Sequence, residues 1–186
     1  RFKAGAKHRQ PSLLLVQLEI PLAIVAQAVT MAAAAGVRII LDPAPAPAGP
    51  LPPEVLQAVD IITPNLHEAR ALIGDPAADG SSCARRLARL GPRTVLVTLG
   101  ADGVVWASAG ASEPVRRPAR SVRAVDATAA GDAFAGALAV ALSEGRPMAE
   151  AIDFAQAAAA LAVTRPGAQA SLPWRREIDA LLATEP

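Results

Sequence analysis

The sequence predicts an α/β fold in which a largely parallel sheet is covered by helices on both faces. Short apolar runs of strand length alternate along the chain with alanine-rich segments of helical length. The strand-like runs are apolar throughout, as strands buried on both faces are, and right-handed crossovers connect parallel strands. At 186 residues, 52% of them hydrophobic, the chain can build one sizeable core. We therefore expect a single domain over residues 1–186.

The first half of the chain supplies three strand-and-helix units. A strand over 12–18 precedes a helix that opens at Pro21 and closes at Gly36, residue types suited to helix ends. The apolar run 37–42 is a second strand, and the connection over 43–53 is rich in proline and glycine. A short helix over 54–59, a short strand over 60–63 and a helix over 65–74 complete this half.

The second half contains the strongest strand signal, over residues 93–100. Residues 103–108 follow closely enough to be its antiparallel hairpin partner. Residues 113–125 are extended and interrupted by proline, as in an edge strand and connection, and their last part, "RSVRAV", is expected to be a strand ending at Val125 or Asp126. Helices are predicted over 82–91, 130–145, 148–164 and 174–184.

Charge and composition argue against several classes of protein. The net charge of +1 does not indicate a nucleic-acid surface, and the basic residues near the start are expected to be a solvated chain end. The single cysteine, Cys83, cannot form an intrachain disulfide, and no spacing of Cys and His resembles a zinc site. No apolar run reaches membrane-spanning length, and residues 1–20 lack the order of a signal peptide. The basic residues near the start are Arg1, Lys3, Lys7, His8 and Arg9. From charge, cysteine content and hydropathy together, we expect a soluble, cytoplasmic protein with no nucleic-acid or membrane partner.

Ligands of such sheets bind at the carboxyl ends of the strands, and the stretch "DATAAGDAFAGAL", residues 126–138, follows one of these ends. Its small residues leave main-chain N–H groups bare at a helix start, which forms an anion site reinforced by the helix dipole. Gly131 permits the tight turn, and Asp132 is placed to act as a general base. The alternative is that Asp126 and Asp132 only cap the helix.

Three other segments are candidates, each with a structural alternative. Asn65 and Glu68 have the spacing of a capping box, or their oxygens hold the water shell of Mg²⁺. The glycine-containing turn over 98–103 admits a nucleotide close to its backbone, or it only closes the hairpin. The loop over 164–171 offers carbonyl oxygens to a monovalent cation, or it only ends a helix. Neither a Walker phosphate loop nor G-x-G-x-x-G is present, and His67 has no partner that would make it catalytic.

Six motifs taken together resemble the rear part of the ribokinases, a group within the PfkB family of carbohydrate kinases. They are "QLEIP", "LDPAPA", "DIITPNLHEA", "VLVTLGADGV", "VDATAAGDAFAGAL" and "TRPGAQASLPWR", and the resemblance runs from about Leu13 to Leu182. It implies a ribokinase-like three-layer α/β/α sandwich with a mostly parallel sheet. The N-terminal strands and the lid, which carry most sugar contacts in the family, are expected to be missing from this chain.

The resemblance implies ATP-dependent phosphorylation of D-ribose at its 5-hydroxyl. It makes Asp132 the catalytic base beside an anion hole formed by Ala129, Ala130 and Gly131, with Glu19 and Asp132 contacting the sugar. It also implies that Asn65 and Glu68 act on Mg²⁺ through water. The implied nucleotide-binding residues are Asn65, Thr98, Leu99, Gly100, Ala101, Asp102, Gly103, Gly131 and Gln156, and the implied K⁺ site comprises Asp126, Thr128, Ala162, Arg165, Gly167 and Ser171. A homodimer is implied for the full-length parent.

Three residues depart from the family pattern. Asp42 stands where ribokinases usually have Asn, Ala127 replaces the usual Thr, and Ala129 takes a place where much of the family has Gly.

Two alternative functions remain open. One is a nucleotide-binding remnant without catalysis, and the other is a PfkB kinase for another sugar or nucleoside.

Overall fold

The computed structural model describes residues 12–184, and the basic cluster near the start, including His8, lies outside the described residues. The elements in chain order are β1 (Leu13–Val16), α1 (Leu22–Ala34), β2 (Arg38–Leu41), α2 (Pro53–Ala58), β3 (Ile61–Ile62), α3 (Leu66–Ile73), α4 (Gly80–Ala88), β4 (Thr94–Thr98), β5 (Val104–Ser108), β6 (Val115–Arg117), α5 (Ala130–Ser143), α6 (Met148–Ala162) and α7 (Arg175–Ala183). Short 3₁₀ turns occupy Gly100–Asp102 and Gln169–Ser171.

The strands form one six-stranded sheet in the order β1-β2-β3-β4-β5-β6. Strands β1 to β4 are parallel, and the register places Leu14 opposite Ile39 and Ile62 opposite Val95. The β4–β5 hairpin is antiparallel, and β6 pairs antiparallel with β5 at the edge. The sheet is therefore mostly parallel with an antiparallel edge, as the sequence predicts.

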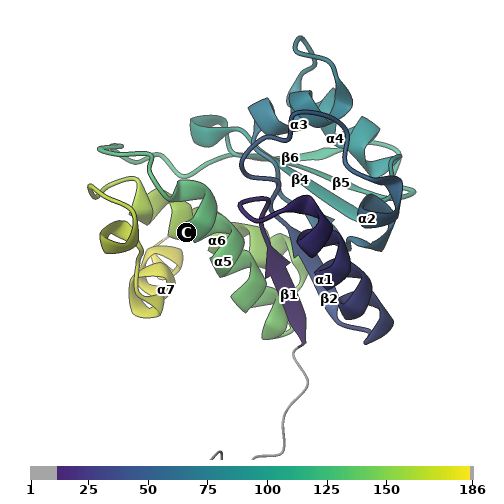
Figure 1. Cartoon of the computed structure of the whole chain (residues 1–186). Helices are drawn as coiled ribbons and strands as arrows, with labels where there is room; N and C mark the ends of the chain where they lie inside the picture. The colour runs from purple at the N-terminus through teal and green to yellow at the C-terminus, as the bar shows by residue number, and fades with distance from the viewer. Residues whose placement is uncertain (1–11, 185–186) are drawn as a thin grey trace, which may run out of the picture.

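Helices cover both faces of this sheet (Figure 1). Successive strand residues face opposite sides, so Ile39 and Leu41 join one buried cluster while Ile40 between them joins the other. The first cluster packs against α1 to α4, and the second packs against α5 to α7. The predicted three-layer α/β/α arrangement is confirmed.

Local sequence signals account for several helix ends. Gly36 and Gly74 follow α1 and α3 in left-handed conformation, with φ of +69° and +65°. Helix α4 begins two residues before its predicted start, because Asp79 accepts a hydrogen bond of 2.7 Å from the main-chain N–H of Ser82. Within the described residues, no helix combines the length and the apolar character needed to cross a membrane.

The predicted strand ending at Val125 or Asp126 is wrong, because residues 118–129 form no strand. The main-chain N–H groups of Val125 and Asp126 both donate to the carbonyl oxygen of Val163, at 2.7 and 3.1 Å. The side chains of Val122 and Val125 are exposed rather than packed in the sheet. This segment is therefore fastened to the end of α6 instead of extending the sheet.

Candidate active site

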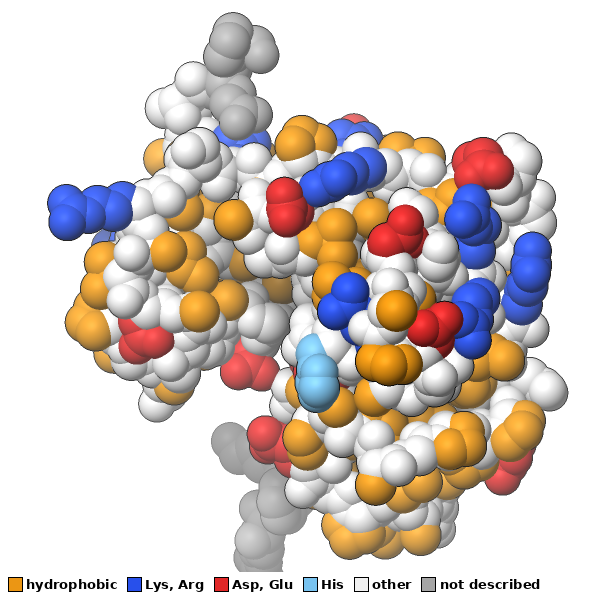
Figure 2. Space-filling view, turned by 90° about the horizontal axis from the view of Figure 1, so that it is seen from above, with side chains coloured by type: hydrophobic (Ala, Val, Ile, Leu, Met, Phe, Trp, Pro, Cys, Tyr) orange, Lys and Arg blue, Asp and Glu red, His pale blue; other side chains and the backbone are white. Residues whose placement is uncertain are grey.

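The candidate site lies along the edge of the sheet that is formed by the carboxyl-terminal ends of β1 to β4, and not along the edge strand β6. Gln17 follows β1, Asp42 follows β2, and Asn65 comes shortly after β3. Asn65 bridges to Thr98 at the end of β4, and the N–H of Thr98 donates to Pro64 at 2.9 Å. Figure 2 looks down on this edge and shows acidic side chains bordering a hollow between the α5–α7 side of the molecule and the rest. Polar groups from four neighbouring strands are thus brought together.

The start of α5 presents unpaired donors to this edge. Within the described residues, the main-chain N–H groups of Gly131 and Asp132 have no hydrogen-bond acceptor, whereas that of Ala130 donates to Ala127 at 3.3 Å. A Cβ atom added to Gly131 would meet nothing within 4 Å, so no side chain covers the helix start. Bare amides at the positive end of a helix are suited to an anion.

Two expectations about this helix start are corrected. The residue in left-handed conformation is Ala129, with φ of +60°, and not Gly131. Neither Asp126 nor Asp132 caps α5, which has no side-chain cap hydrogen bond. Asp126 instead accepts hydrogen bonds from the main-chain N–H and the hydroxyl of Thr128, at 2.9 and 2.6 Å. The tight turn is therefore made by a non-glycine residue, and the helix N–H groups remain free.

Asp132 is connected to the sheet through a glutamine. The Nε2 amide of Gln17 donates to Oδ1 of Asp132 at 2.8 Å and to Oδ2 of Asp42 at 2.9 Å. Within the described part of the chain, Oδ2 of Asp132 has no hydrogen-bond partner, and the residue is exposed. The carboxylate is thus held at one oxygen and open at the other, an arrangement that leaves an acceptor for a substrate proton.

Asp42 is an unusual carboxyl group because its residue is only 6% exposed. Burial raises the pKa of Asp42 to about 6, the hydrogen bond from Gln17 opposes the rise, and the negative charges of Glu68, Asp132 and Glu19 add to it. Glu19, the exposed residue predicted to contact the sugar, and the buried Glu68 are therefore close enough to Asp42 to act on its charge, as Asp132 is. The edge therefore concentrates negative charge, which favours a cation there.

Asn65 and Glu68 form the predicted capping box at the start of α3. The Asn65 side chain accepts from the N–H of Glu68 at 2.9 Å, and the two oxygens of Glu68 accept from the side-chain and main-chain nitrogens of Asn65 at 2.7 and 2.8 Å. Within residues 12–184, no group of three or more His, Cys, Asp or Glu side chains could hold a metal ion directly. Both oxygens of Glu68 already accept hydrogen bonds, so these residues suit contact with the water shell of Mg²⁺ better than direct ligation.

The turn over 98–103 closes the β4–β5 hairpin, which is one of the two roles that the sequence predicts for it. Leu99 donates its N–H to Gly103 at 2.7 Å, and Gly100 and Gly103 have φ of +59° and +92°. A Cβ on Gly103 would lie 2.0 Å from the carbonyl oxygen of Arg117, whereas one on Gly100 would meet nothing within 4 Å. Gly103 is needed for packing against β6. Gly100, Ala101 and Asp102 are exposed, and Asp102 forms an ion pair of 3.2 Å with Arg116.

Gln156 lies in α6 and is 9% exposed. Its Oε1 atom is buried and has no hydrogen-bond partner. A buried acceptor without a donor is costly, so this atom requires a water or a ligand group. A hydrogen-bond donor on a bound nucleotide would give Oε1 of Gln156, a predicted nucleotide-binding residue, the partner that it lacks.

The predicted K⁺ residues come from two loops that the structure joins. The second oxygen of Asp126 accepts from the main-chain N–H of Gly167 at 2.8 Å, and hydrogen bonds from Thr128 and Gly167 lower the pKa of Asp126 to about 2. The Ser171 hydroxyl is buried and donates to Ala168 at 2.8 Å, and Ala162 is the buried last residue of α6. Arg165 instead forms an ion pair with Glu177, so its side chain is engaged elsewhere.

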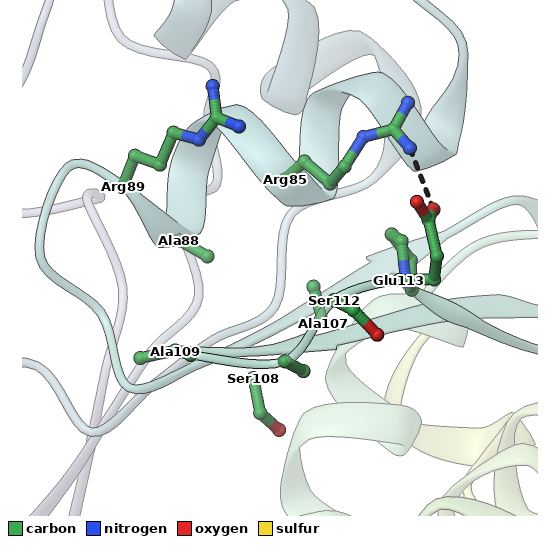
Figure 3. A pocket seen from close by; sticks show the side chains of 11 residues that line it. Arg85, Ala88, Arg89, Ala107, Ser108, Ala109, Ser112 and Glu113 are labelled. Carbon is green, nitrogen blue, oxygen red and sulfur yellow. Dashed lines mark hydrogen bonds and ion pairs between the residues drawn. The ribbon is translucent and has the colours of Figure 1, made fainter.

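A pocket of about 400 Å³ lies between α4 and the loop joining β5 to β6 (Figure 3), near the start of β4 and thus at the end of the sheet away from the candidate site. Its lining includes Ser108, which pairs with Thr94 at the start of β4. Arg85 reaches Glu113 beside it in an ion pair of 2.9 Å. None of the predicted site residues lines this pocket, so it is separate from the candidate site.

Gln17 is not among the site residues predicted from the sequence. The signal was available, because Gln17 is the polar residue that directly follows an apolar strand, like Asp42 after the next one. Its contact with Asp132 spans 115 positions in the sequence, so the pairing itself depends on how α5 packs against β1.

Comparison with known proteins finds relatives of this chain among sugar kinases. The chain is 44% identical over 178 residues to the ribokinase of Haemophilus influenzae, covering 94% of this chain and 57% of that relative. Among solved structures, it matches the Arabidopsis thaliana ribokinase complexed with ribose and ATP, with a TM-score of 0.86, 35% identity and coverage of 94% of this chain and 56% of that one. It also matches a ribokinase-II-like protein of E. coli complexed with ATP and Mg²⁺, with a TM-score of 0.77, 26% identity and coverage of 94% and 59%.

The chain spans about half the length of the curated relatives it matches. The model of the family described as pfkB family carbohydrate kinase matches residues 4–175, which is most of the sequence. The open helix start of α5, the three-layer fold and this match together lead to one conclusion: the chain belongs to the pfkB family of carbohydrate kinases.

Proposed function

We propose that this chain is one domain, residues 1–186, that carries the phosphoryl-transfer machinery of a ribokinase-type sugar kinase. The reaction is transfer of the terminal phosphoryl group of ATP to the 5-hydroxyl of D-ribose. The observation that carries the proposal is the geometry of Asp132, whose Oδ2 is unpaired while the amides of Gly131 and Asp132 beside it are bare. A proton acceptor next to an anion site is what transfer of a phosphoryl group to an alcohol requires.

In this proposal Asp132 takes the proton of the sugar hydroxyl as it attacks. The N–H groups at the start of α5 donate to the transferring phosphoryl group, and Glu19 contacts the sugar. The hairpin turn over 98–103 and Gln156 hold the nucleotide, a role supported by the unpaired buried Oε1 of Gln156. The ribose and ATP of the Arabidopsis relative support the choice of substrates.

Metal ions complete the proposal. When bound with ATP, Mg²⁺ supplies charge neutralisation of the phosphates, and Asn65 and Glu68 contact its water shell. The ATP and Mg²⁺ complex of the E. coli relative supports this ion. K⁺ binds main-chain carbonyl oxygens of the two loops that Asp126 joins. We place the reaction in the cytoplasm, where ATP is supplied, and the homodimer of the full-length parent stays a prediction.

The test measures ADP release by the protein with Mg²⁺ and ATP, with and without D-ribose, in K⁺ and in Na⁺ at equal ionic strength. Ribose-dependent release that is higher in K⁺ supports the proposal. Replacement Asp132→Asn should lower turnover about 10²- to 10⁴-fold, as expected for loss of a general base. Near-normal turnover of the Asp132→Asn variant would remove that role.

A second function is favoured by one observation, that the chain spans 57% of its Haemophilus relative. Phosphoryl transfer depends on positioning of both substrates, so a protein that binds nucleotide without positioning a sugar does not turn the nucleotide over. Calorimetry with Mg²⁺ and ATP separates the two functions. Binding heat without ribose-dependent ADP release indicates a nucleotide-binding protein, and release of ADP indicates the kinase.

A further inference from the structure

Gln17 is held rigidly at the end of β1. The residue before it, Val16, accepts a main-chain hydrogen bond from Asp42 at 2.9 Å, and the residue after it, Leu18, donates to Ala44 at 2.9 Å. Both flanking residues are thus fixed to the chain that follows β2. The main chain of Gln17 therefore cannot shift without breaking these contacts at the sheet edge.

The side-chain amide of Gln17 has two hydrogens, and each has its own carboxylate acceptor. One goes to Asp42, which is 6% exposed and whose main-chain N–H is bonded to Val16, and the other goes to Asp132, which is exposed. Both neighbours are acceptors when ionised, so the nitrogen and not the oxygen of the amide must face them. Asp42 thus anchors the amide, and the amide in turn fixes one oxygen of Asp132.

No other side chain in the described residues forms a hydrogen bond or ion pair with the Asp132 carboxylate. An aspartate on the first turn of a helix rotates freely unless something holds it, and a misplaced catalytic group loses much of its effect. A neutral amide can hold the carboxylate without adding a positive charge. Lysine or arginine at the same place would stabilise the ionised form and so weaken it as a base.

We infer that Gln17 is a positioning residue, whose amide is anchored on Asp42 and holds Oδ1 of Asp132 so that Oδ2 meets the attacking hydroxyl group. The inference rests on the proposed function, since it takes Asp132 as the base. Gln17 itself does not touch the reacting atoms in this scheme. Its effect on the reaction is exerted through Asp132 alone.

The kinetic test uses Gln17→Met, which removes the donor and keeps a side chain of similar length. We expect kcat to fall about 10- to 100-fold while the KM for ATP is unchanged, the size expected for misplacement of a catalytic group. In the Asp132→Asn background, Gln17→Met should cause no further fall, because residues that act through one group are not additive. Gln27→Met, at an exposed residue of α1, is the matched control and should behave as the unchanged protein.

Two results separate failure of this inference from failure of the proposed function. If Gln17→Met lowers kcat by the same factor with Asp132→Asn as without it, Gln17 is not a positioning residue, although Asp132 can still be the base. If Asp132→Asn alone leaves turnover normal, Asp132 is not the base, and if the unchanged protein shows no ribose-dependent ADP release, the proposed function itself is wrong.

A spectroscopic test applies whether or not the protein turns over substrate. In ¹⁵N–¹H spectra of the 186-residue chain, Asp132→Ala should shift the side-chain amide resonances of Gln17, because one of its hydrogens loses its acceptor. The amide resonances of Gln27 should not move. If the Gln17 amide resonances are the same with and without the Asp132 carboxylate, the hydrogen bond does not exist in solution and the inference is overturned.

Discussion

Asp126 accepts a hydrogen bond of 2.8 Å from the main-chain N–H of Gly167 and thereby joins the loop before α5 to the loop after α6. The same carboxylate accepts two hydrogen bonds from Thr128, so its charge is held by three donors. The two loops that would surround a monovalent cation are therefore fixed to each other by a side chain.

This relationship predicts a pH-dependent contribution of Asp126 to stability. Its pKa is lowered to about 2 in the folded protein, so its stabilising effect is complete above the ordinary value of 3.8 and is lost as the pH falls toward 2. Asp126→Asn should lower the melting temperature at pH 7, and the difference should shrink between about pH 4 and pH 2. Thermal unfolding across this range checks it. A pH-independent difference for Asp126→Asn would contradict the prediction.

Asp42 should have the opposite effect on stability. Its pKa of about 6 lies above the ordinary value of 3.8, so the folded state holds a proton that the unfolded state has released, and stability falls as the pH rises through this interval. A shift of this size corresponds to about 3 kcal/mol. Asp42→Asn should therefore raise the free energy of unfolding at pH 8 by up to about 3 kcal/mol and have little effect at pH 4. Urea unfolding at the two pH values measures this, and equal gains at both would rule out the ionisation as the cause.

Ala129 predicts a stabilising substitution at the start of α5. A non-glycine residue with φ of +60° is strained by about 1 to 2 kcal/mol. Ala129→Gly removes this strain, and the greater freedom of glycine in the unfolded chain offsets about 0.4 to 1 kcal/mol of the gain. We expect a net increase of up to about 1 kcal/mol in the free energy of unfolding.

The matched control for this substitution is Ala127→Gly, two residues earlier in the same loop. Ala127 has no positive φ, so the same change there should destabilise the protein by about 0.4 to 1 kcal/mol. Urea unfolding of both variants measures the difference. A loss of stability in both would show that Ala129 is not strained.

Gly103 and Gly100 form a second matched pair, in the β4–β5 hairpin. Gly103→Ala would bring a Cβ to 2.0 Å from the carbonyl oxygen of Arg117 and should cost about 3 kcal/mol or more. Gly100→Ala has room for the methyl group and should cost only the strain of its positive φ, about 1 to 2 kcal/mol. Denaturant unfolding compares them, and equal losses would mean that the contact with β6 is not maintained in solution.

The sequence predicted those parts of the fold that local patterns determine. The apolar run over 93–100 and the glycines at 100 and 103 indicated a strand and its hairpin, and β4 and β5 lie there. The run over 120–125 gave a false strand, because an extended backbone can pair with a helix end as well as with a sheet. Here it pairs with Val163, a contact 38 positions away from Val125 that no local pattern contains.

The candidate site was predictable to the same extent. The bare helix start follows from the small residues before Asp132, and the capping box follows from the spacing of Asn65 and Glu68. Ala129 as the left-handed residue was not foreseen, because glycine is the residue type that indicates such a conformation. The contact of Gln17 with Asp132 joins the first strand to the fifth helix, so it required the packing of the whole sheet edge.

Strand β2 also shows how a polar residue can determine alignment during folding. Ile39, Ile40 and Leu41 are all fully buried, so a slip of one residue would exchange apolar for apolar on both faces. Asp42 cannot enter the dry interior of the sheet in the same way, because an unpaired carboxyl group there is costly. A slip of one residue would also take Asp42 away from Gln17 and leave its carboxyl group unpaired, so we expect this acid to limit how far β2 can slide between its neighbours.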